Sequence, residues 1–132
     1  PAGLGGTAPE LVPLIGTMVT KRYFDATREP GFRAILGEHA RTIVVGGCEA
    51  HVCVLQTVLG LLAQDRRVVL VADAVGSRRP EDRAVALERA ARAGAEIVTT
   101  EMVLFEWLAT CDHPRFREVL ALVRRSGTKE ER

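Results

Sequence analysis

Short apolar runs of β-type residues alternate along this chain with longer helical stretches, and no other feature constrains its fold as strongly. Four runs predict strands: 17–20 (TMVT), 42–45 (TIVV), 67–72 (RVVLVA) and 97–99 (IVT). Five stretches predict helices: 30–39, 51–64, 80–93, 101–109, and a last one that opens at 112–114 and runs through 124. This alternation predicts right-handed crossovers and therefore an α/β fold, with a parallel sheet covered by helices on both faces.

The chain is long enough for one domain with a sizeable core: it has 132 residues, of which 47% are apolar. We expect a single domain over residues 1–132, without an internal repeat or linker. The Gly- and Pro-rich residues 1–16 predict a loop, and the polar residues 126–132 predict a frayed tail. Because the run 42–45 is continuously apolar, it predicts a strand buried on both faces.

Charge and composition argue against several classes of partner. Eighteen Lys and Arg against 17 Asp and Glu leave a net charge of +1, and only 5% of the residues are aromatic. The chain therefore lacks the basic surface and the stacking residues expected for binding nucleic acid. Its apolar runs are interrupted within about ten residues, too few to span a membrane. Three cysteines, an odd number, and no visible secretory signal favour free thiols in the cytoplasm.

Candidate site residues follow from the topology, because ligands of open parallel sheets bind beyond the carboxyl ends of the strands. The positions that follow the four predicted strands are Lys21, 46–53, 73–78 and 99–100.

Cys53 is the most informative of these candidates, since it falls in the opening turn of a helix just after the Gly-rich end of a strand. Free N–H groups and the helix dipole stabilise a thiolate there, and the same N–H groups can hold an oxyanion. The alternative, and the commoner one on pattern alone, is a small core residue that begins an apolar helix. Lys21 leaves the same choice open, between a charge that favours a nearby thiolate and a solvated loop lysine.

No metal or cofactor is predicted. Cys48 is expected to be buried at the end of its strand, and a Cys48–His51–Cys53 metal site lacks a convincing fourth ligand. The glycine pair 46–47 does not have the G-x-G-x-x-G spacing of a dinucleotide site, so a nucleotide-binding Rossmann domain is a weak alternative. Arg78 and Arg79 either meet an anion or are solvated arginines beside a helix.

Several stretches together resemble the isochorismatase-like cysteine hydrolases, most closely the isochorismatase domain-containing proteins and their bacterial homologues. They are PAGLGGTAPEL, TKRYFDATREPGF, VVGGCEAHVCVLQT, RVVLVADAVGSRRPEDR, and AGAEIVTTEMVLFEWL followed by HPRFREVL. They cover nearly the whole chain in the order that the family has. The pairing of GxEAHVCVLQT with the later DAVxSRxxxD is the most specific part of the resemblance.

The resemblance implies a three-layer αβα sandwich around a six-stranded, Rossmann-like parallel sheet. It also implies a Cys–Lys–Asp set that hydrolyses a C–N bond, typically an amide, through a thioester, with Cys53 as the nucleophile and Lys21 as the catalytic lysine. A non-proline cis peptide is implied between Cys48 and Glu49, and an oxyanion hole from the backbone N–H groups of Glu49 and Cys53. The residues expected to contact a small-molecule substrate are Tyr23, Phe24 and Cys48.

The chain departs from the family pattern in one respect, because the aspartate of the family's first strand has no counterpart by motif. The resemblance therefore implies an N-terminally truncated member that lacks the first two strands and the first helix. In the family's strand order, 3-2-1-4-5-6, these strands would lie between 17–20 and 42–45, so strand edges and apolar surface would be exposed. We expect either a cysteine hydrolase or, as the alternative, a catalytically incomplete member that acts as a binding or assembly module.

A homo-oligomer is also expected from the resemblance. The apolar segment 102–108, with Phe105 and Trp107, is a candidate interface. The alternative is that these side chains simply pack on the sheet of their own chain.

Overall fold

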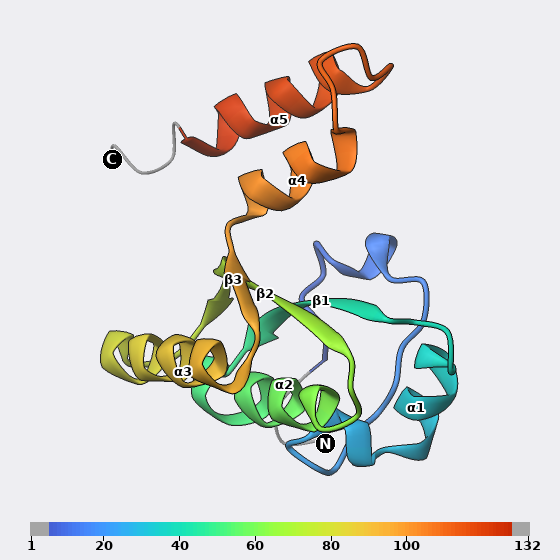
Figure 1. The fold of residues 1–132 in the computed structure, drawn as a ribbon, viewed down its shortest axis with the longest axis vertical. Coiled ribbons are helices and arrows are strands. Elements are labelled where there is room, and N and C mark those ends of the chain that lie inside the picture. The colour runs from blue at the N-terminus through green and yellow to red at the C-terminus, as the bar shows by residue number, and fades with distance from the viewer. Residues whose placement is uncertain (1–5, 128–132) are drawn as a thin grey trace.

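The computed structural model describes residues 6–127, and its elements follow the predicted alternation (Figure 1). The strands are β1 (Thr42–Cys48), β2 (Arg67–Gly76) and β3 (Glu96–Val98). The helices are α1 (Pro30–Leu36), α2 (Leu55–Leu62), α3 (Pro80–Ala93), α4 (Thr100–Leu108) and α5 (Phe116–Gly127). Short turns include the 3-10 turns η2 (Val12–Leu14) and η3 (Ala26–Arg28) and the π-type turn η4 (Ala50–Val54).

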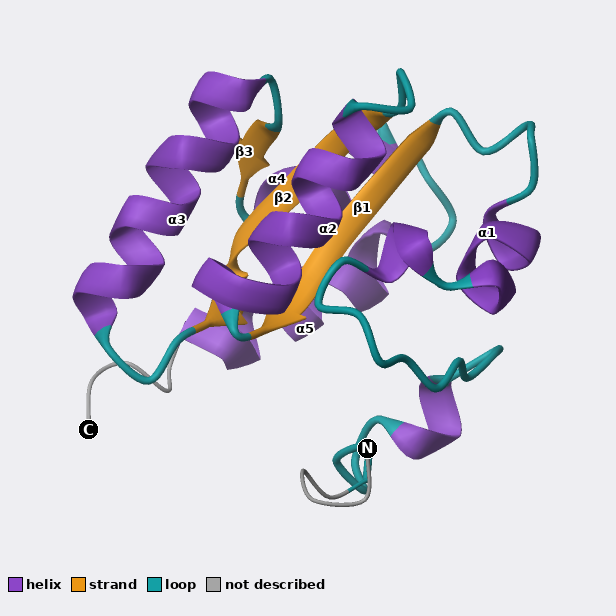
Figure 2. Ribbon diagram, turned by 90° about the horizontal axis from the view of Figure 1, so that it is seen from below, coloured by secondary structure: helices purple, strands orange, loops and turns teal. Residues whose placement is uncertain are grey.

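The described strands form one parallel sheet in which β2 lies between β1 and β3 (Figure 2). Ile43 of β1 is opposite Val68 of β2, and Leu70 of β2 is opposite Ile97 of β3. Helices α2 and α3 cover one face of the sheet, and α4 contacts β2 from the other face. The predicted α/β fold with a parallel sheet between helical layers is thus confirmed.

β2 contributes to the core on both of its faces, because successive side chains of a strand point to opposite sides. Val68 and Leu70 belong to a cluster with the fully buried Val58 and Leu61 of α2. The intervening side chains pack against α4 and β3 in a second cluster, formed by Val69, Val71, Val98 and Val103. The central strand therefore holds the helical layers together.

The prediction that the strand at 42–45 is buried on both faces is wrong. Ile43 and Val45 pack against the core, but Val44 between them is 43% exposed. The reason is that successive side chains of a strand point to opposite faces: Ile43 and Val45 point to the core cluster, and Val44 points to the other face. Cys48 was expected to be buried at the end of this strand, but it is exposed, because its sulfur lies over Gly76 of β2, which has no side chain to cover it.

The run 17–20 also differs from its prediction, because it is not assigned to a strand. A β-type run becomes a strand only where another strand pairs with it, and none of the described strands does so here. The described sheet therefore has three strands where four were predicted from the sequence.

The two ends of the chain are described only in part. Helix α5 continues through Gly127, so residues 126 and 127 belong to a helix and not to the predicted frayed tail. Residues 128–132 of that tail and residues 1–5 of the predicted loop lie outside the described residues. Helices α4 and α5 extend away from the rest of the molecule (Figure 1), and Phe105 meets Phe116 edge-on with ring centroids 6.3 Å apart. Across residues 6–127, no helix combines the length and the apolar character needed to cross a bilayer.

Candidate functional site

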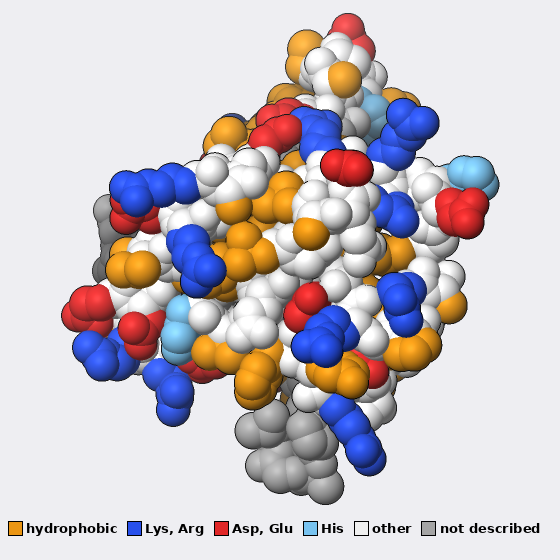
Figure 3. All heavy atoms as spheres, turned by 60° about the horizontal axis from the view of Figure 1, so that its bottom comes forward, with side chains coloured by type: hydrophobic (Ala, Val, Ile, Leu, Met, Phe, Trp, Pro, Cys, Tyr) orange, Lys and Arg blue, Asp and Glu red, His pale blue; other side chains and the backbone are white. Residues whose placement is uncertain are grey.

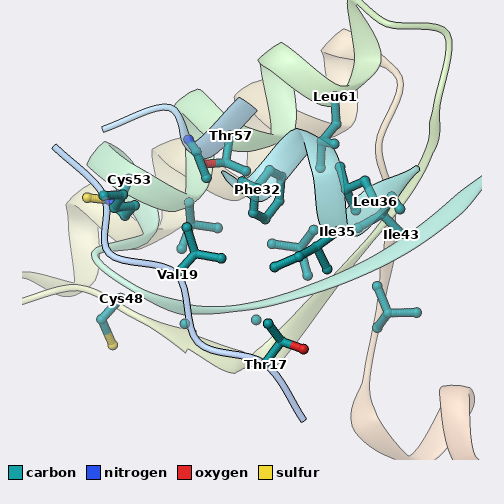
Figure 4. Close-up of a pocket in the computed structure, with 17 residues that line it drawn as sticks. Thr17, Val19, Phe32, Ile35, Leu36, Ile43, Cys48, Cys53, Thr57 and Leu61 are labelled. Carbon is teal, nitrogen blue, oxygen red and sulfur yellow. The ribbon is translucent and has the colours of Figure 1, made fainter. Parts of the chain in front are cut away.

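A groove of about 460 Å³ runs beside β1, on the part of the molecule that holds Cys53 (Figure 4). Its walls come from the extended segment 17–21, from α1, from β1, and from the helical run formed by η4 and α2. Most of its lining is apolar, with Phe32, Ile35 and Leu36 contributed by α1. No Asp or Glu is among the described residues that line it.

Cys53 lies at one end of this groove, within the π-type turn η4 that connects β1 to α2 (Figure 4). The turn begins directly after Glu49, whose carbonyl oxygen accepts from the N–H groups of Val52 and Val54, both at 3.2 Å. Cys53 is half-buried, whereas its neighbour Val54 is only 6% exposed and belongs to the core. The sulfur is therefore beside a cavity and is not enclosed by the core.

The backbone that leads into this turn depends on glycine. Gly47 has a φ of +131°, which an L side chain rarely adopts. A Cβ at Gly46 would lie 3.2 Å from the carbonyl oxygen of Ala74 on β2. The strand register shifts between Val45 and Gly47, and the peptide between Cys48 and Glu49 is cis, as the resemblance implied.

The side chains of Glu49 and His51 are directed toward the corner between β2 and α3. The Glu49 carboxylate accepts from the Arg78 N–H at 3.1 Å and lies 3.7 Å from Nδ1 of His51. The same imidazole nitrogen is 2.9 Å from the Ser77 hydroxyl, and its Nε2 is 3.9 Å from the Asp82 carboxylate. These contacts attach the turn η4, which carries Cys53, to the corner between β2 and α3.

The same arrangement bears on the other ligand sites considered from the sequence. His51 does not join Cys48 and Cys53 in a metal site, since no group of three potential ligands comes together within residues 6–127. Arg78 and Arg79 are exposed but lie near carboxylates, Arg78 near Glu49 and Arg79 near Asp82.

The positions after β2 and β3 serve to connect elements. The Asp73 carboxylate accepts from the N–H and the hydroxyl of Thr100, at 2.7 and 3.0 Å, and so ties β2 to the start of α4. Thr99 caps the same helix by accepting from the N–H of Met102 at 3.3 Å.

Lys21 lines the same groove as Cys53, at the end of the extended segment. Its ammonium donates to the carbonyl oxygens of Tyr23 and Phe24, at 3.2 and 3.5 Å. The rings of Tyr23 and Phe24 are 46% and 58% exposed, and neither residue is among those that line the groove. Their role as substrate contacts stays a prediction.

The three cysteines of the chain have different surroundings. Cys48 lines the groove, but its side chain points away from the other labelled side chains in Figure 4. Its sulfur lies over Gly76 of β2, where an added Cβ would be 3.3 Å away. Cys111 is exposed in the loop before α5. Cys48 and Cys53 both line the groove that Lys21 also lines, but only Cys53 belongs to the helical run that follows β1.

Sequence reasoning missed the residues that dock the Lys21 loop onto α2. Thr57 of α2 accepts from the Ala26 N–H at 3.0 Å, and the Asp25 carboxylate accepts from both the N–H and the hydroxyl of Thr27. The one sequence signal is Gly60, because a glycine in the middle of a helix disfavours helix formation. A Cβ there would be 2.5 to 2.6 Å from Thr27 and Asp25.

Comparisons with known proteins agree on one family. Residues 4–102 match the model of the Isochorismatase domain. Isochorismatase domain-containing protein 1 of Danio rerio is 38% identical over 129 residues, which are 96% of this chain and 46% of that protein. Isochorismatase domain-containing protein 2 of Bos taurus is 35% identical over 124 residues, 94% of this chain and 61% of that protein. The chain thus spans about half the length of the curated relatives it matches.

Solved structures share the fold of the chain. A protein named MAR1 ribonuclease from Caenorhabditis elegans superposes with a TM-score of 0.84 and 36% identity, over 93% of this chain and 65% of that one. A nicotinamidase/pyrazinamidase from Bacillus subtilis superposes with a TM-score of 0.56 and 24% identity, over 59% of this chain and 44% of that one, and shares the fold.

Proposed function

The chain belongs to the isochorismatase domain family, and from this premise we propose that it is the nucleophile-bearing part of a cysteine hydrolase that cleaves a C–N bond of a small molecule. One observation carries the proposal: Cys53, at the strand-to-helix turn, and Lys21, on a separate segment, line the same groove. Cys48 lines the same groove, but its sulfur lies over Gly76 of β2. The family's hydrolases supply the reaction class.

In the proposed reaction the Cys53 thiolate attacks the carbonyl carbon of an amide. The negative charge that develops on the carbonyl oxygen is stabilised by backbone N–H groups of Glu49 and Cys53. The C–N bond then breaks, and the nitrogen takes up the proton that the thiol gave to its acceptor, so that ammonia or an amine leaves. Water hydrolyses the remaining thioester to the acid and restores the thiol. The positive charge of Lys21 favours the thiolate before the attack.

The proton acceptor for the thiol is the part of this scheme that the described groove does not contain. Two carboxylates lie in the Lys21 loop, and both bind loop groups: Asp25 accepts from Thr27, and Glu29 accepts from the N–H groups of Arg22 and Tyr23. The family resemblance assigns this role to an aspartate from another segment. We propose that the 132 residues alone are a poor catalyst, which favours the second candidate, a binding or assembly module, for this stretch in isolation.

Ammonia release from a panel of small amides tests the proposal. The longest reading frame that contains the chain is compared with the 132 residues alone. Cys53→Ala should abolish turnover, and Lys21→Met should reduce it strongly. Cys111→Ser, which removes an exposed cysteine far from the groove, should leave it unchanged. Turnover that survives Cys53→Ala would exclude the cysteine mechanism, whereas no turnover by either form would favour the binding module.

The site is proposed to act on a small molecule and not on nucleic acid. On the face shown in Figure 3, Lys and Arg side chains are interspersed with Asp and Glu side chains, with apolar groups between them. That surface does not form the continuous basic track that binds a phosphate backbone. Three structural relatives carry a ribonuclease name, which makes RNA cleavage a necessary control.

We also propose that the chain associates with a second copy of itself through α4 and α5. Trp107 of α4 is 68% exposed, and Met102 of α4 and Leu122 of α5 are each 46% exposed. α4 has exposed acidic side chains, including Glu106, and α5 has exposed basic ones, including Arg117. Apolar contact combined with opposite charge supports a pairing of α4 of one copy with α5 of the other.

A further inference from the structure

The loop that carries Lys21 is held together by its own hydrogen bonds. The Lys21 ammonium donates to the carbonyl oxygens of Tyr23 and Phe24. The Glu29 carboxylate accepts from the N–H groups of Arg22 and Tyr23, at 2.5 and 2.9 Å. The Arg28 guanidinium lies 4.4 Å from the centre of the Tyr23 ring. Because these contacts join both ends of the loop, a movement at its base is transmitted to Lys21.

The base of this loop docks on α2 at one place. Ala26 and Thr27 are 9% and 5% exposed, and they lie against the helix. The Ala26 N–H donates to the hydroxyl oxygen of Thr57 at 3.0 Å, and that hydroxyl donates to the Phe24 carbonyl at 3.4 Å. A single side chain of α2 therefore satisfies two backbone groups of the loop.

Gly60 makes room for this docking. A Cβ at Gly60 would lie 2.5 Å from the Thr27 hydroxyl and 2.6 Å from each oxygen of the Asp25 carboxylate. The carboxylate itself accepts from the Thr27 N–H at 2.8 Å and from the Thr27 hydroxyl at 2.7 Å, and so caps η3. Glycine in the middle of a helix costs about 1 kcal/mol relative to alanine. The sequence thus has a residue that weakens α2 at the position where the loop packs most closely on it.

Thr57 connects the docking to the candidate nucleophile. It follows Cys53 by four positions in one continuous helical run, and both residues line the groove together with Lys21 and Ala26. The helix that presents the sulfur is therefore the same helix that holds the base of the lysine loop.

We propose that Asp25, Thr27 and Thr57, packed over Gly60, form a positioning latch that fixes the Lys21 ammonium relative to Cys53. This inference rests on the proposed function. The latch residues are positioning residues, since they act on Lys21 through the loop and on no reacting atom. Nothing in the family's Cys–Lys–Asp set requires such a contact.

The test measures how the rate of Cys53 alkylation by iodoacetamide depends on pH. The background is the full chain with Cys48→Ser and Cys111→Ser, in which Cys53 is the only thiol. An ordinary thiol reaches half its maximal rate near pH 8.5, and a displacement of the profile by one pH unit changes the rate at pH 7 about tenfold. We expect Lys21→Met to move the profile of the background protein to higher pH.

The latch predicts that Thr57→Val, which keeps the side-chain volume and removes the hydroxyl, moves the pH–rate profile of Cys53 alkylation to higher pH, as Lys21→Met does. The rate at pH 7 should fall at least about threefold. Thr57→Ser, which keeps a hydroxyl, should show the same profile as the background protein. Thr110→Val is the matched control, because it also removes a hydroxyl that accepts a backbone N–H, from Asp112 at 3.2 Å, in a remote loop. Its profile should not move.

The outcomes separate the latch from the proposed function. If Lys21→Met raises the profile and Thr57→Val does not, the latch is wrong and the lysine's role stands. If Lys21→Met has no effect, the proposed activation of Cys53 by Lys21 is wrong. The latch is then wrong as well, because it is proposed to position Lys21 for that role. Should Thr57→Val fail to fold, Asp25→Ala takes its place, because it removes the oxygen that accepts from the Thr27 N–H and hydroxyl. An unmoved profile in that variant overturns the latch equally.

Discussion

Replacing Gly60 by alanine tests the docking of the Lys21 loop through the stability of the fold. In an exposed helix this change stabilises by about 1 kcal/mol, because alanine loses less backbone freedom on folding. Here the added Cβ would be 2.5 to 2.6 Å from Thr27 and Asp25, whereas ordinary contact begins near 3.4 Å. The loop must therefore move away from α2, or the Asp25 carboxylate must leave its position.

The magnitude follows from the hydrogen bonds at stake. The carboxylate accepts two of them from Thr27, at 2.8 and 2.7 Å, and hydrogen bonds to a charged group contribute about 1.5–3 kcal/mol each. Losing one and weakening the other costs about 3 kcal/mol. After the helix-propensity gain of about 1 kcal/mol, Gly60→Ala should destabilise the protein by about 2 kcal/mol.

Urea unfolding followed by circular dichroism measures this change as a lower midpoint with an unchanged slope. Gly31→Ala in α1 is the matched control, since the new Cβ would be 3.4 Å from Val19, and we expect it to be neutral or slightly stabilising. The double variant Gly60→Ala/Asp25→Ala should lose less stability than the sum of its two single variants, because one removes the group that the other displaces. A higher midpoint for Gly60→Ala would refute the reasoning.

Four further predictions concern the core, the loop, the surface and the substrate. Leu61→Ala, at a fully buried side chain, should destabilise by about 2–5 kcal/mol in the same unfolding assay. The N–H groups of Tyr23 and Arg22 hold the pKa of the Glu29 carboxyl below its ordinary 4.5, so its contribution to stability is present above about pH 4.5 and is lost as the pH falls below that value. Glu29→Gln should therefore flatten the stability profile between about pH 3 and 5. Trp107→Glu should lower the molar mass measured by light scattering if the two-copy pairing is right, and an unchanged mass would contradict it. Labelled RNA should stay intact with the chain under conditions where amides are tested, and RNA cleavage abolished by Cys53→Ala would reverse the choice of substrate class.

Local sequence signals identified most helices because their ends depend on nearby residues. The predicted range 80–93 matches α3 without error, and Gly94, a residue type that ends helices, adopts a φ of +112° directly after it. Thr99, directly before α4, is of a residue type that caps helices, and it caps this one. These signals act over a few residues and need no tertiary partner.

Strands were predicted less well because their extent depends on pairing. β1 continues past Val45 through both glycines, since Gly47 and Cys48 pair with Val75 and Gly76 of β2. The run 17–20 has the composition of a strand but none of the described strands pairs with it. Neither outcome is visible in the residues of the segment itself.

The sequence predicted the reactive residues of the candidate site but not the residues that hold them in place. The cysteine and the lysine stand out by residue type and by motif, and both line one groove. The contact between Thr57 and Ala26 joins residues 31 positions apart and involves ordinary residue types, so no pattern in the sequence indicates it.

The position of β1 at the border of the sheet has a measurable consequence for its amide hydrogens. Along a parallel strand, consecutive N–H groups point alternately toward the two flanking sides, and β1 has a strand neighbour on the β2 side alone among residues 6–127. Every second amide between Thr42 and Val45 should exchange slowly with deuterium, and those between them should exchange almost as fast as in a free peptide. Any molecule that adds a strand at this border would slow the fast set selectively and would reveal itself by that signature.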